Sequence, residues 1–372
     1  MKSWDIFCSV VDNYGDIGVT WRLARQLSSE YGQSVRLVVD DLNVFTHLCP
    51  EVDARLSTQE VMSVEIRSWT TNLQLEPADV VIEAFGCSLT HPYIELMSQR
   101  TPQSCWINLE YLSAEQWVEG CHLLPSPQLI GPRKVFFFPG FTNNTGGLLR
   151  ENGLLEQRRD FDMDKQVRFL ASLGVDRPED GLLISLFCYD NPQIGTWLSA
   201  IDHGRQPVFL LVSPSQIERR ICEWLGLSAL EQGRVYRCAS LTIQSIPFLP
   251  QADYDKLLWS CDINFVRGED SFVRAQWAAK PFVWHIYPQD DDAHLQKISA
   301  FMERYVSELS QDASQALWAF WLDFNRLKPM GESWARWLGH QSENALNAQA
   351  WCDEISAGKT LAKSLAEFTR NC

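Results

Sequence analysis

Short, continuously apolar runs that alternate with amphipathic segments are the feature that most limits the fold of this chain. In the first part, strands are predicted at residues 5–11, 35–39, 79–84, 104–108 and 135–138, with a helix at 17–29. Strands that are apolar along their whole length are typical of a parallel sheet covered by helices on both faces. The pattern therefore predicts a doubly wound α/β domain.

The pattern begins again after a polar segment, which indicates a second domain. Residues 175–181 read Val-Asp-Arg-Pro-Glu-Asp-Gly and are the best candidate for a linker, and a long charged helix is predicted before them at 150–173. Further strands are predicted at 182–187, 208–212, 241–248, 262–266 and 282–285, with helices near 214–225, 251–260 and 271–279, and only helices from about residue 291. Ligands of such sheets bind beyond the carboxyl ends of the strands, so we expect a site in a cleft between two Rossmann-like domains.

Charge excludes some classes of partner. The chain of 372 residues has a formal net charge of −15. Nucleic acids and anionic membrane surfaces need basic protein surface, so we expect neither as a partner, whereas a cationic substrate group is allowed. The longest apolar runs are also too short to cross a bilayer.

Cysteine usage favours a cytoplasmic protein. The eleven cysteines are scattered and form no C-x-x-C pair, and the first residues lead directly into a predicted strand rather than a secretory signal. We therefore expect free, mostly buried thiols in a reducing compartment.

The loop that follows the predicted strand 262–266 combines features that seem to conflict. It reads Arg267-Gly268-Glu269-Asp270, and Ser271 is predicted to open a helix. Backbone N–H groups at a helix start bind anions, and the fork of Arg267 suits phosphate. The two carboxylates do not suit phosphate. Either Ser271 and the acids only cap the helix, or Glu269 points away from a bound diphosphate and towards a reacting centre.

A second acidic loop follows the first strand. Gly15 and Gly18 would allow a tight turn before the helix, but Asp12 and Asp16 would repel a pyrophosphate, and G-x-x-G is not the dinucleotide fingerprint. Either Asp16 caps the helix, or the two carboxylates face the cleft and orient a cation or act as a general base.

Aromatic side chains near strand ends form a third group. Flat rings at such positions can hold a nucleobase, although each ring alone could equally belong to the core. The residues are Phe187, Tyr189, Phe248, Tyr254 and Tyr287. For metals, His285 and His294 are nine residues apart and lack supporting ligands, so the histidines indicate no metal site.

At these residues the sequence resembles a known family, the bacterial protein-arginine rhamnosyltransferases that modify translation elongation factor P. The likeness extends over nearly the whole chain. The matching motifs lie at residues 12–18, 21–25, 110–115, 125–128, 267–276 and 284–290.

This resemblance implies a GT-B glycosyltransferase fold and a cytoplasmic enzyme that needs no metal and no cofactor. It implies that L-rhamnose passes, with inversion, from dTDP-β-L-rhamnose to a guanidinium nitrogen of an arginine in elongation factor P. Residues 1–178 would form the domain that binds the protein acceptor, completed by a C-terminal helix at 345–372, and residues 179–344 would bind the nucleotide sugar.

Carried over by position, the resemblance also implies site residues. Asp12, Asp16 and Glu269 resemble the catalytic carboxylates, and Asn13, Gly15 and Gly18 the acceptor loop. The residues that resemble the donor pocket are Phe187, Tyr189, Phe248, Gln251, Tyr254, Arg267, Asp270, Ser271 and Tyr287. At Tyr254 some members of the family have Phe, so the ring is kept and a hydroxyl is added.

The chemistry explains why carboxylates are needed. Arginine has a pKa above about 12 and delocalised lone pairs, so it is a poor nucleophile. We expect Asp16 to take a proton as the C–N bond forms, with Asp12 and Glu269 orienting the guanidinium. Two alternatives are a GT-B transferase that joins a UDP- or GDP-sugar to a small molecule, and a nucleotide-sensing or scaffold protein without catalysis.

Overall fold

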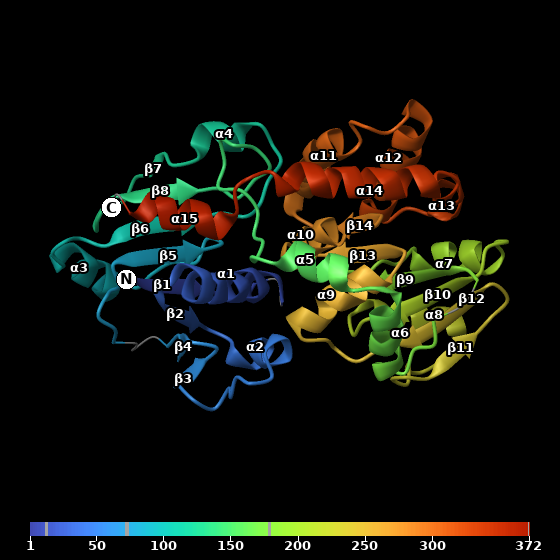
Figure 1. Cartoon of the computed structure of the whole chain (residues 1–372), viewed down its shortest axis with the longest axis horizontal. Coiled ribbons are helices and arrows are strands. Elements are labelled where there is room, and N and C mark those ends of the chain that lie inside the picture. The colour runs from blue at the N-terminus through green and yellow to red at the C-terminus, as the bar shows by residue number, and fades with distance from the viewer. Residues whose placement is uncertain (12–13, 71–73, 178–179, 371) are drawn as a thin grey trace. The chain divides into compact units, whose positions relative to one another are not determined.

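The computed structural model describes residues 1–11, 14–70, 74–177, 180–370 and 372. The chain divides into two compact units. The first comprises Met1–Leu154 together with Ile355–Cys372, and the second comprises Leu155–Glu354. Figure 1 shows that each unit is a β-sheet with helices packed against it.

The first unit contains an eight-stranded sheet in the order β3-β4-β2-β1-β5-β6-β8-β7. Its strands are β1 (Ser3–Cys8), β2 (Ser34–Val39), β3 (Thr58–Val61), β4 (Val64–Ser68), β5 (Val80–Ala84), β6 (Cys105–Leu109), β7 (Pro125–Ser126) and β8 (Lys134–Phe137). The central strands are parallel, and β3 and β7 run antiparallel to their neighbours at the two edges. Because β1 pairs with both β2 and β5, the order of the strands reverses beside β1.

Helices from both ends of the chain cover this sheet. They are α1 (Gly15–Tyr31), α2 (Leu42–Leu48), α3 (His91–Gln99), α4 (Trp117–Cys121) and α15 (Leu361–Thr369). In Figure 1, α15 is drawn in red among the blue and teal elements of the first unit, and it packs against α1. The strand-like bridge between Leu148 and Thr360 joins the same two parts of the chain.

Gly147 makes this junction possible. Its φ is +78°, and a Cβ atom at this position would lie 2.1 Å from the carbonyl oxygen of Lys359. A residue with a side chain would therefore meet both backbone strain and a steric clash.

The second unit contains a six-stranded sheet in the order β11-β12-β10-β9-β13-β14. Its strands are β9 (Leu182–Leu186), β10 (Val208–Val212), β11 (Val235–Arg237), β12 (Leu241–Ser245), β13 (Ile263–Arg267) and β14 (Phe282–His285). Every residue of β9 and β13 is buried, as the continuous apolar runs predict.

The helices of this unit include α5 (Leu154–Asp160), which begins at the boundary between the units. The others are α6 (Met163–Ser172), α7 (Ile194–Asp202), α8 (Ile217–Leu225), α9 (Gln251–Ser260), α10 (Asp270–Ala278), α11 (Ala293–Tyr305), α12 (Gln311–Asn325), α13 (Gly331–Leu338) and α14 (Gln341–Ser356), with a short 3-10 turn η1 (Asp290–Asp292). In the described chain, no helix is both long and apolar enough to span a membrane.

Several expectations need correction. The segment 150–173 is two helices, because Asp162 interrupts it and caps α6 by accepting the N–H of Lys165 at 2.9 Å. The boundary expected at 178/179 lies at 154/155, and residues 345–354 belong to the second unit rather than the first. Cys105 and Cys372 are paired as a disulfide, whereas free thiols were predicted.

Candidate functional site

In the first unit, Asp16 is a buried carboxylate that two groups hold in place. It lies in the first turn of α1 and is 2% exposed. Oδ2 accepts the N–H of Val11 at 2.9 Å, and Oδ1 accepts the hydroxyl of Tyr111 at 3.1 Å. The N-cap residue of α1 is Tyr14, so the interpretation of Asp16 as the helix cap is wrong. Both Asp16 oxygens are instead held by groups outside the helix.

The rest of the acidic loop differs in part from the prediction. Helix α1 begins at Gly15, two residues earlier than expected. The N–H of Gly18 donates to the carbonyl oxygen of Tyr14 at 2.9 Å, so both glycines lie in the first turn rather than before it. The predicted catalytic Asp12 and its neighbour Asn13 lie outside the described residues.

In the second unit, β13 turns directly into α10. Gly268 has φ +61°, and its carbonyl oxygen accepts the indole N–H of Trp284 at 2.9 Å. Glu269 is the N-cap residue and makes no side-chain cap, so α10 begins one residue before the predicted Ser271. The hydroxyl of Ser271 accepts the N–H of Arg267 at 3.1 Å and donates to the carbonyl oxygen of the same residue. Ser271 thus closes the turn and is not the helix cap.

Arg267 gathers the predicted aromatic residues into one cluster. It is 6% exposed, and its guanidinium carbon lies 4.5 Å from the ring centre of Phe187 and 4.9 Å from that of Tyr189. Tyr189 meets Tyr287 edge to face at 5.5 Å, and Phe187 meets Tyr254 at 6.0 Å. A guanidinium over aromatic faces is a favourable cation–π arrangement. Four of the five predicted aromatic residues therefore form one cluster, and two of them lie directly against the predicted phosphate-binding arginine.

The remaining donor-pocket candidates lie on the neighbouring elements. The side-chain amide of Gln251, at the start of α9, donates to Oδ2 of Asp270 at 3.3 Å. Phe248 lies half-buried in the segment between β12 and α9. The nine donor candidates thus occupy the last residue of β13, the segments that follow β9, β12 and β14, and the first turns of α9 and α10.

A buried ion pair that no sequence motif predicted joins α9 to α10. Arg274 and Asp255 have side chains only 2% and 7% exposed. Two parallel hydrogen bonds connect them, Nε to Oδ1 at 2.8 Å and Nη2 to Oδ2 at 2.7 Å. The pair fixes the two helices whose first turns carry donor candidates. Arg274 lies inside the matching motif 267–276, but no local signal in the sequence indicates that it is buried and paired with Asp255.

His285 is a second residue that the sequence analysis did not place at this site. It is 1% exposed, its ring lies 5.4 Å from that of Tyr189, and its Nδ1 has no hydrogen-bond partner among the described residues. Burial, and then the positive charge of Arg267, lower the pKa of His285 to about 3. The imidazole is therefore neutral at physiological pH.

The two units offer different chemistry. The second unit combines a guanidinium, a helix N-terminus and aromatic rings, which together suit a nucleoside diphosphate. The first unit offers a fixed carboxylate, which suits a cation. Among the residues that the structure describes, no group of three or more His, Cys, Asp or Glu side chains could hold a metal ion.

Comparison with known families identifies the chain. The profile of the family described as elongation factor P (EF-P) rhamnosyltransferase EarP matches residues 4–370. The chain belongs to the EarP family. It is therefore a member of a family of rhamnosyltransferases, as the motifs indicated.

Individual EarP relatives match over their full length. The protein-arginine rhamnosyltransferase of Pseudomonas putida is 53% identical over 372 residues, and that of Pseudomonas aeruginosa is 49% identical over 371 residues, with 99% of each chain covered in both comparisons. A solved structure on EarP-mediated arginine glycosylation of translation elongation factor EF-P is 39% identical, with a TM-score of 0.73 over 100% of this chain and 99% of the other.

A more distant structure shows the shared fold alone. A UDP-glucosyltransferase from Polygonum tinctorium is 11% identical, with a TM-score of 0.53 over 99% of this chain and 98% of the other. Together with the two sheets described above, these similarities confirm the predicted GT-B fold built from two Rossmann-like domains.

Proposed function

We propose that this chain transfers L-rhamnose from dTDP-β-L-rhamnose to one arginine of elongation factor P, with inversion at the anomeric carbon. The observation that carries the proposal is the pairing of two kinds of site in one EarP-family chain. The second unit holds Arg267 stacked on aromatic rings, and the first holds the buried carboxylate of Asp16. One suits an anionic nucleotide, and the other a cationic acceptor.

The donor binds to the second unit. Its diphosphate lies against Arg267 and the N–H groups at the start of α10, and its base lies against the aromatic cluster. As the sugar leaves, negative charge grows on the diphosphate, and these same groups stabilise it. Because Arg267 and the helix start supply this positive charge, we propose that transfer needs no metal ion.

The acceptor guanidinium binds at the acidic loop of the first unit. One of its nitrogens attacks the anomeric carbon as the bond to the diphosphate oxygen breaks on the opposite face, which inverts the configuration. A proton passes from that nitrogen to Asp16, whose oxygens Val11 and Tyr111 hold in a fixed orientation. Asp12 and Glu269 orient the guanidinium.

Mass spectrometry of the acceptor tests the proposal directly. Full-length elongation factor P is incubated with the protein and dTDP-β-L-rhamnose, and we expect one deoxyhexose on one arginine. Absence of any adduct would show that the proposal is wrong.

A thermal-shift comparison tests the donor class. With dTDP, UDP and GDP in parallel, we expect the largest rise in melting temperature with dTDP, because ligands that bind the native state stabilise it. A larger shift with UDP or GDP would favour a different sugar donor.

A further inference from the structure

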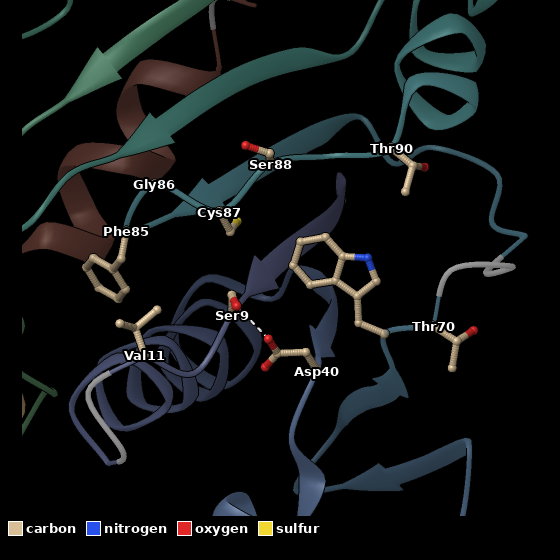
Figure 2. Close-up of a pocket in the computed structure, with 10 residues that line it drawn as sticks. Ser9, Val11, Asp40, Thr70, Phe85, Gly86, Cys87, Ser88 and Thr90 are labelled. Carbon is tan, nitrogen blue, oxygen red and sulfur yellow. Dashed lines mark hydrogen bonds between the residues drawn. The ribbon is translucent and has the colours of Figure 1, made fainter.

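The first unit contains a cavity of about 470 Å³ that the proposed reaction does not use. Figure 2 shows residues from separate segments facing it. Ser9, Asp40, Trp69 and Phe85 line it, and they follow β1, β2, β4 and β5 respectively. The cavity therefore lies at the carboxyl ends of the strands, where the strand order reverses, and this is where doubly wound sheets bind ligands.

The walls of the cavity suit a cation. Asp40 is exposed, and its carboxylate accepts the hydroxyl of Ser9 and, at 2.9 Å, the N–H of Val10. A carboxylate has about four lone-pair positions, so Asp40 can accept further hydrogen bonds. The indole of Trp69, packed 5.1 Å from Phe7, adds an aromatic face. Among the residues that the structure describes, the ten that line the cavity include no basic side chain.

Two of the residues that line the cavity also connect it to Asp16. Val11 lines the cavity, and its N–H donates to Oδ2 of Asp16 at 2.9 Å. Phe85 also lines it and stacks at 4.7 Å on Tyr111, whose hydroxyl donates to Oδ1 of Asp16. A group held in the cavity is therefore a near neighbour of the group held at Asp16.

The backbone at Phe85 is strained. Its φ is +58°, in the left-handed region that aromatic residues rarely adopt. Such conformations cost on the order of 1–3 kcal/mol and are concentrated at ligand and active sites. The strain places Phe85 between the cavity and Tyr111.

We propose that this cavity is a second subsite for the protein acceptor, and that it holds a lysine or arginine side chain that lies close to the reacting arginine in the folded acceptor. This inference rests on the proposed function. An anionic occupant such as a nucleotide would face the carboxylate of Asp40 in a chain with a net charge of −15. A basic side chain would meet Asp40 and the face of Trp69 instead.

Steady-state kinetics with full-length elongation factor P tests the subsite. Asp40→Asn keeps an acceptor oxygen for the N–H of Val10, and its amide NH₂ can donate to the hydroxyl oxygen of Ser9, but the charge is removed. We expect KM for elongation factor P to rise about tenfold, which corresponds to about 1.4 kcal/mol of lost binding, while KM for dTDP-β-L-rhamnose stays within about twofold. Ser88→Tyr, at an exposed wall position, should raise KM for elongation factor P in the same way by filling the cavity.

Glu60→Gln, which removes an exposed charge on β3 of the same unit, is the matched control and should leave both KM values unchanged. An unchanged KM for elongation factor P in both Asp40→Asn and Ser88→Tyr would overturn the subsite.

A double-mutant cycle tests the identity of the occupant. Each lysine and arginine of elongation factor P other than the modified one is replaced by alanine and assayed with the wild-type enzyme and with Asp40→Asn. We expect one basic residue whose replacement raises KM with the wild-type enzyme but has no further effect with Asp40→Asn. If no basic residue is coupled to Asp40, the cation assignment is overturned. If the wild-type enzyme adds no rhamnose to elongation factor P, the proposed function fails first, and the subsite fails with it.

Discussion

Arg267 shows how one residue can serve two purposes at this site. Its guanidinium stacks on Phe187 and Tyr189, while its backbone N–H and carbonyl oxygen bond to the hydroxyl of Ser271. The side chain is therefore held at the end of β13 with its charge beside the first turn of α10. This arrangement supports the interpretation in which Arg267 faces a diphosphate and Glu269, which makes no side-chain cap of α10, faces the acceptor.

Replacing Arg267 should weaken donor binding. Arg267→Ala removes the charge and the stacking contact, so we expect the affinity for dTDP to fall by about tenfold or more. Isothermal titration calorimetry measures this directly. Equal affinity in the wild-type protein and the variant would remove Arg267 from the phosphate site.

Asp16→Asn should reduce turnover and leave dTDP binding intact, unlike Arg267→Ala. The amide keeps an oxygen for one of the two donors that bond to Asp16, but it cannot take the proton, so we expect turnover to fall by about 10²- to 10⁴-fold. Affinity for dTDP should remain unchanged by calorimetry, because Asp16 belongs to the other unit. Turnover within a fewfold of the wild-type value would exclude Asp16 as the base.

His285 gives the fold a defined pH dependence. In the unfolded chain a histidine binds its proton below about pH 6.5, whereas in the folded protein burial lowers the pKa of His285 to about 3. Between these values the unfolded state holds the extra proton, so stability falls as pH falls, by at most about 1.4 kcal/mol per pH unit. His285→Phe should flatten the dependence of the unfolding free energy on pH between 6.5 and 4. The unfolding free energy is measured by urea titration at each pH. The same dependence on pH in the variant and the wild-type protein would contradict this.

At the scale of elements, the sequence predicted what depends on local pattern. The strand, glycine turn and helix around Gly268 were predicted to within one residue, since apolar periodicity and a turn residue are local signals. The bond from Tyr111 to Asp16 spans 95 residues, and the pair Asp255–Arg274 depends on how two helices pack. Such contacts depend on tertiary placement, which no short motif encodes.

The same limit explains the errors in the helices. Asp162 was expected inside one long helix, but its side chain bonds to the backbone of Lys165 and begins a new helix instead. The edge strands β3, β7 and β11 were also missed, because they are short and only partly buried.

Breaking the buried ion pair between α9 and α10 should destabilise the second unit strongly. Asp255→Ala leaves the guanidinium of Arg274 buried without its partner, and we expect a loss of about 3–5 kcal/mol in the free energy of unfolding. Chemical denaturation measures the loss. The double variant Asp255→Leu with Arg274→Met should recover much of it, because removing both charges removes the desolvation cost. A double variant no more stable than Asp255→Ala would contradict this explanation.

At the scale of the whole molecule, the alternation of strands and helices was sufficient to predict two α/β units, but not their boundary. The segment 175–181 has the composition of a linker, yet it connects α6 to β9 within the second unit. Composition marks exposed loops, and an exposed loop inside a unit looks the same as one between units.

Gly147 allows a test of the contact that joins the C-terminal segment to the rest of the first unit. Gly147 has a left-handed backbone, and Gly147→Ala places a methyl group against the carbonyl oxygen of Lys359. We therefore expect the free energy of unfolding to fall by about 1–3 kcal/mol. Differential scanning calorimetry should show a lower transition temperature, while dTDP affinity, which we assign to the second unit, stays the same. Gly32→Ala, at a left-handed glycine with no atom within 4 Å of its Cβ position, isolates the backbone strain from the clash. If Gly147→Ala lowers the free energy of unfolding no more than Gly32→Ala does, the structure relieves the contact with Lys359.

The return of α15 to the first unit also sets the order in which the molecule can form during synthesis. Residues 155–354 are contiguous, so the second unit, which we propose binds the nucleotide, can complete its sheet while the ribosome is still adding the remaining residues. The half that carries Asp16 is made first but finished last, because Leu361 and Leu365 must leave the ribosome before they can be buried in it. A nascent chain therefore gains the proposed donor half before it gains a complete acceptor half.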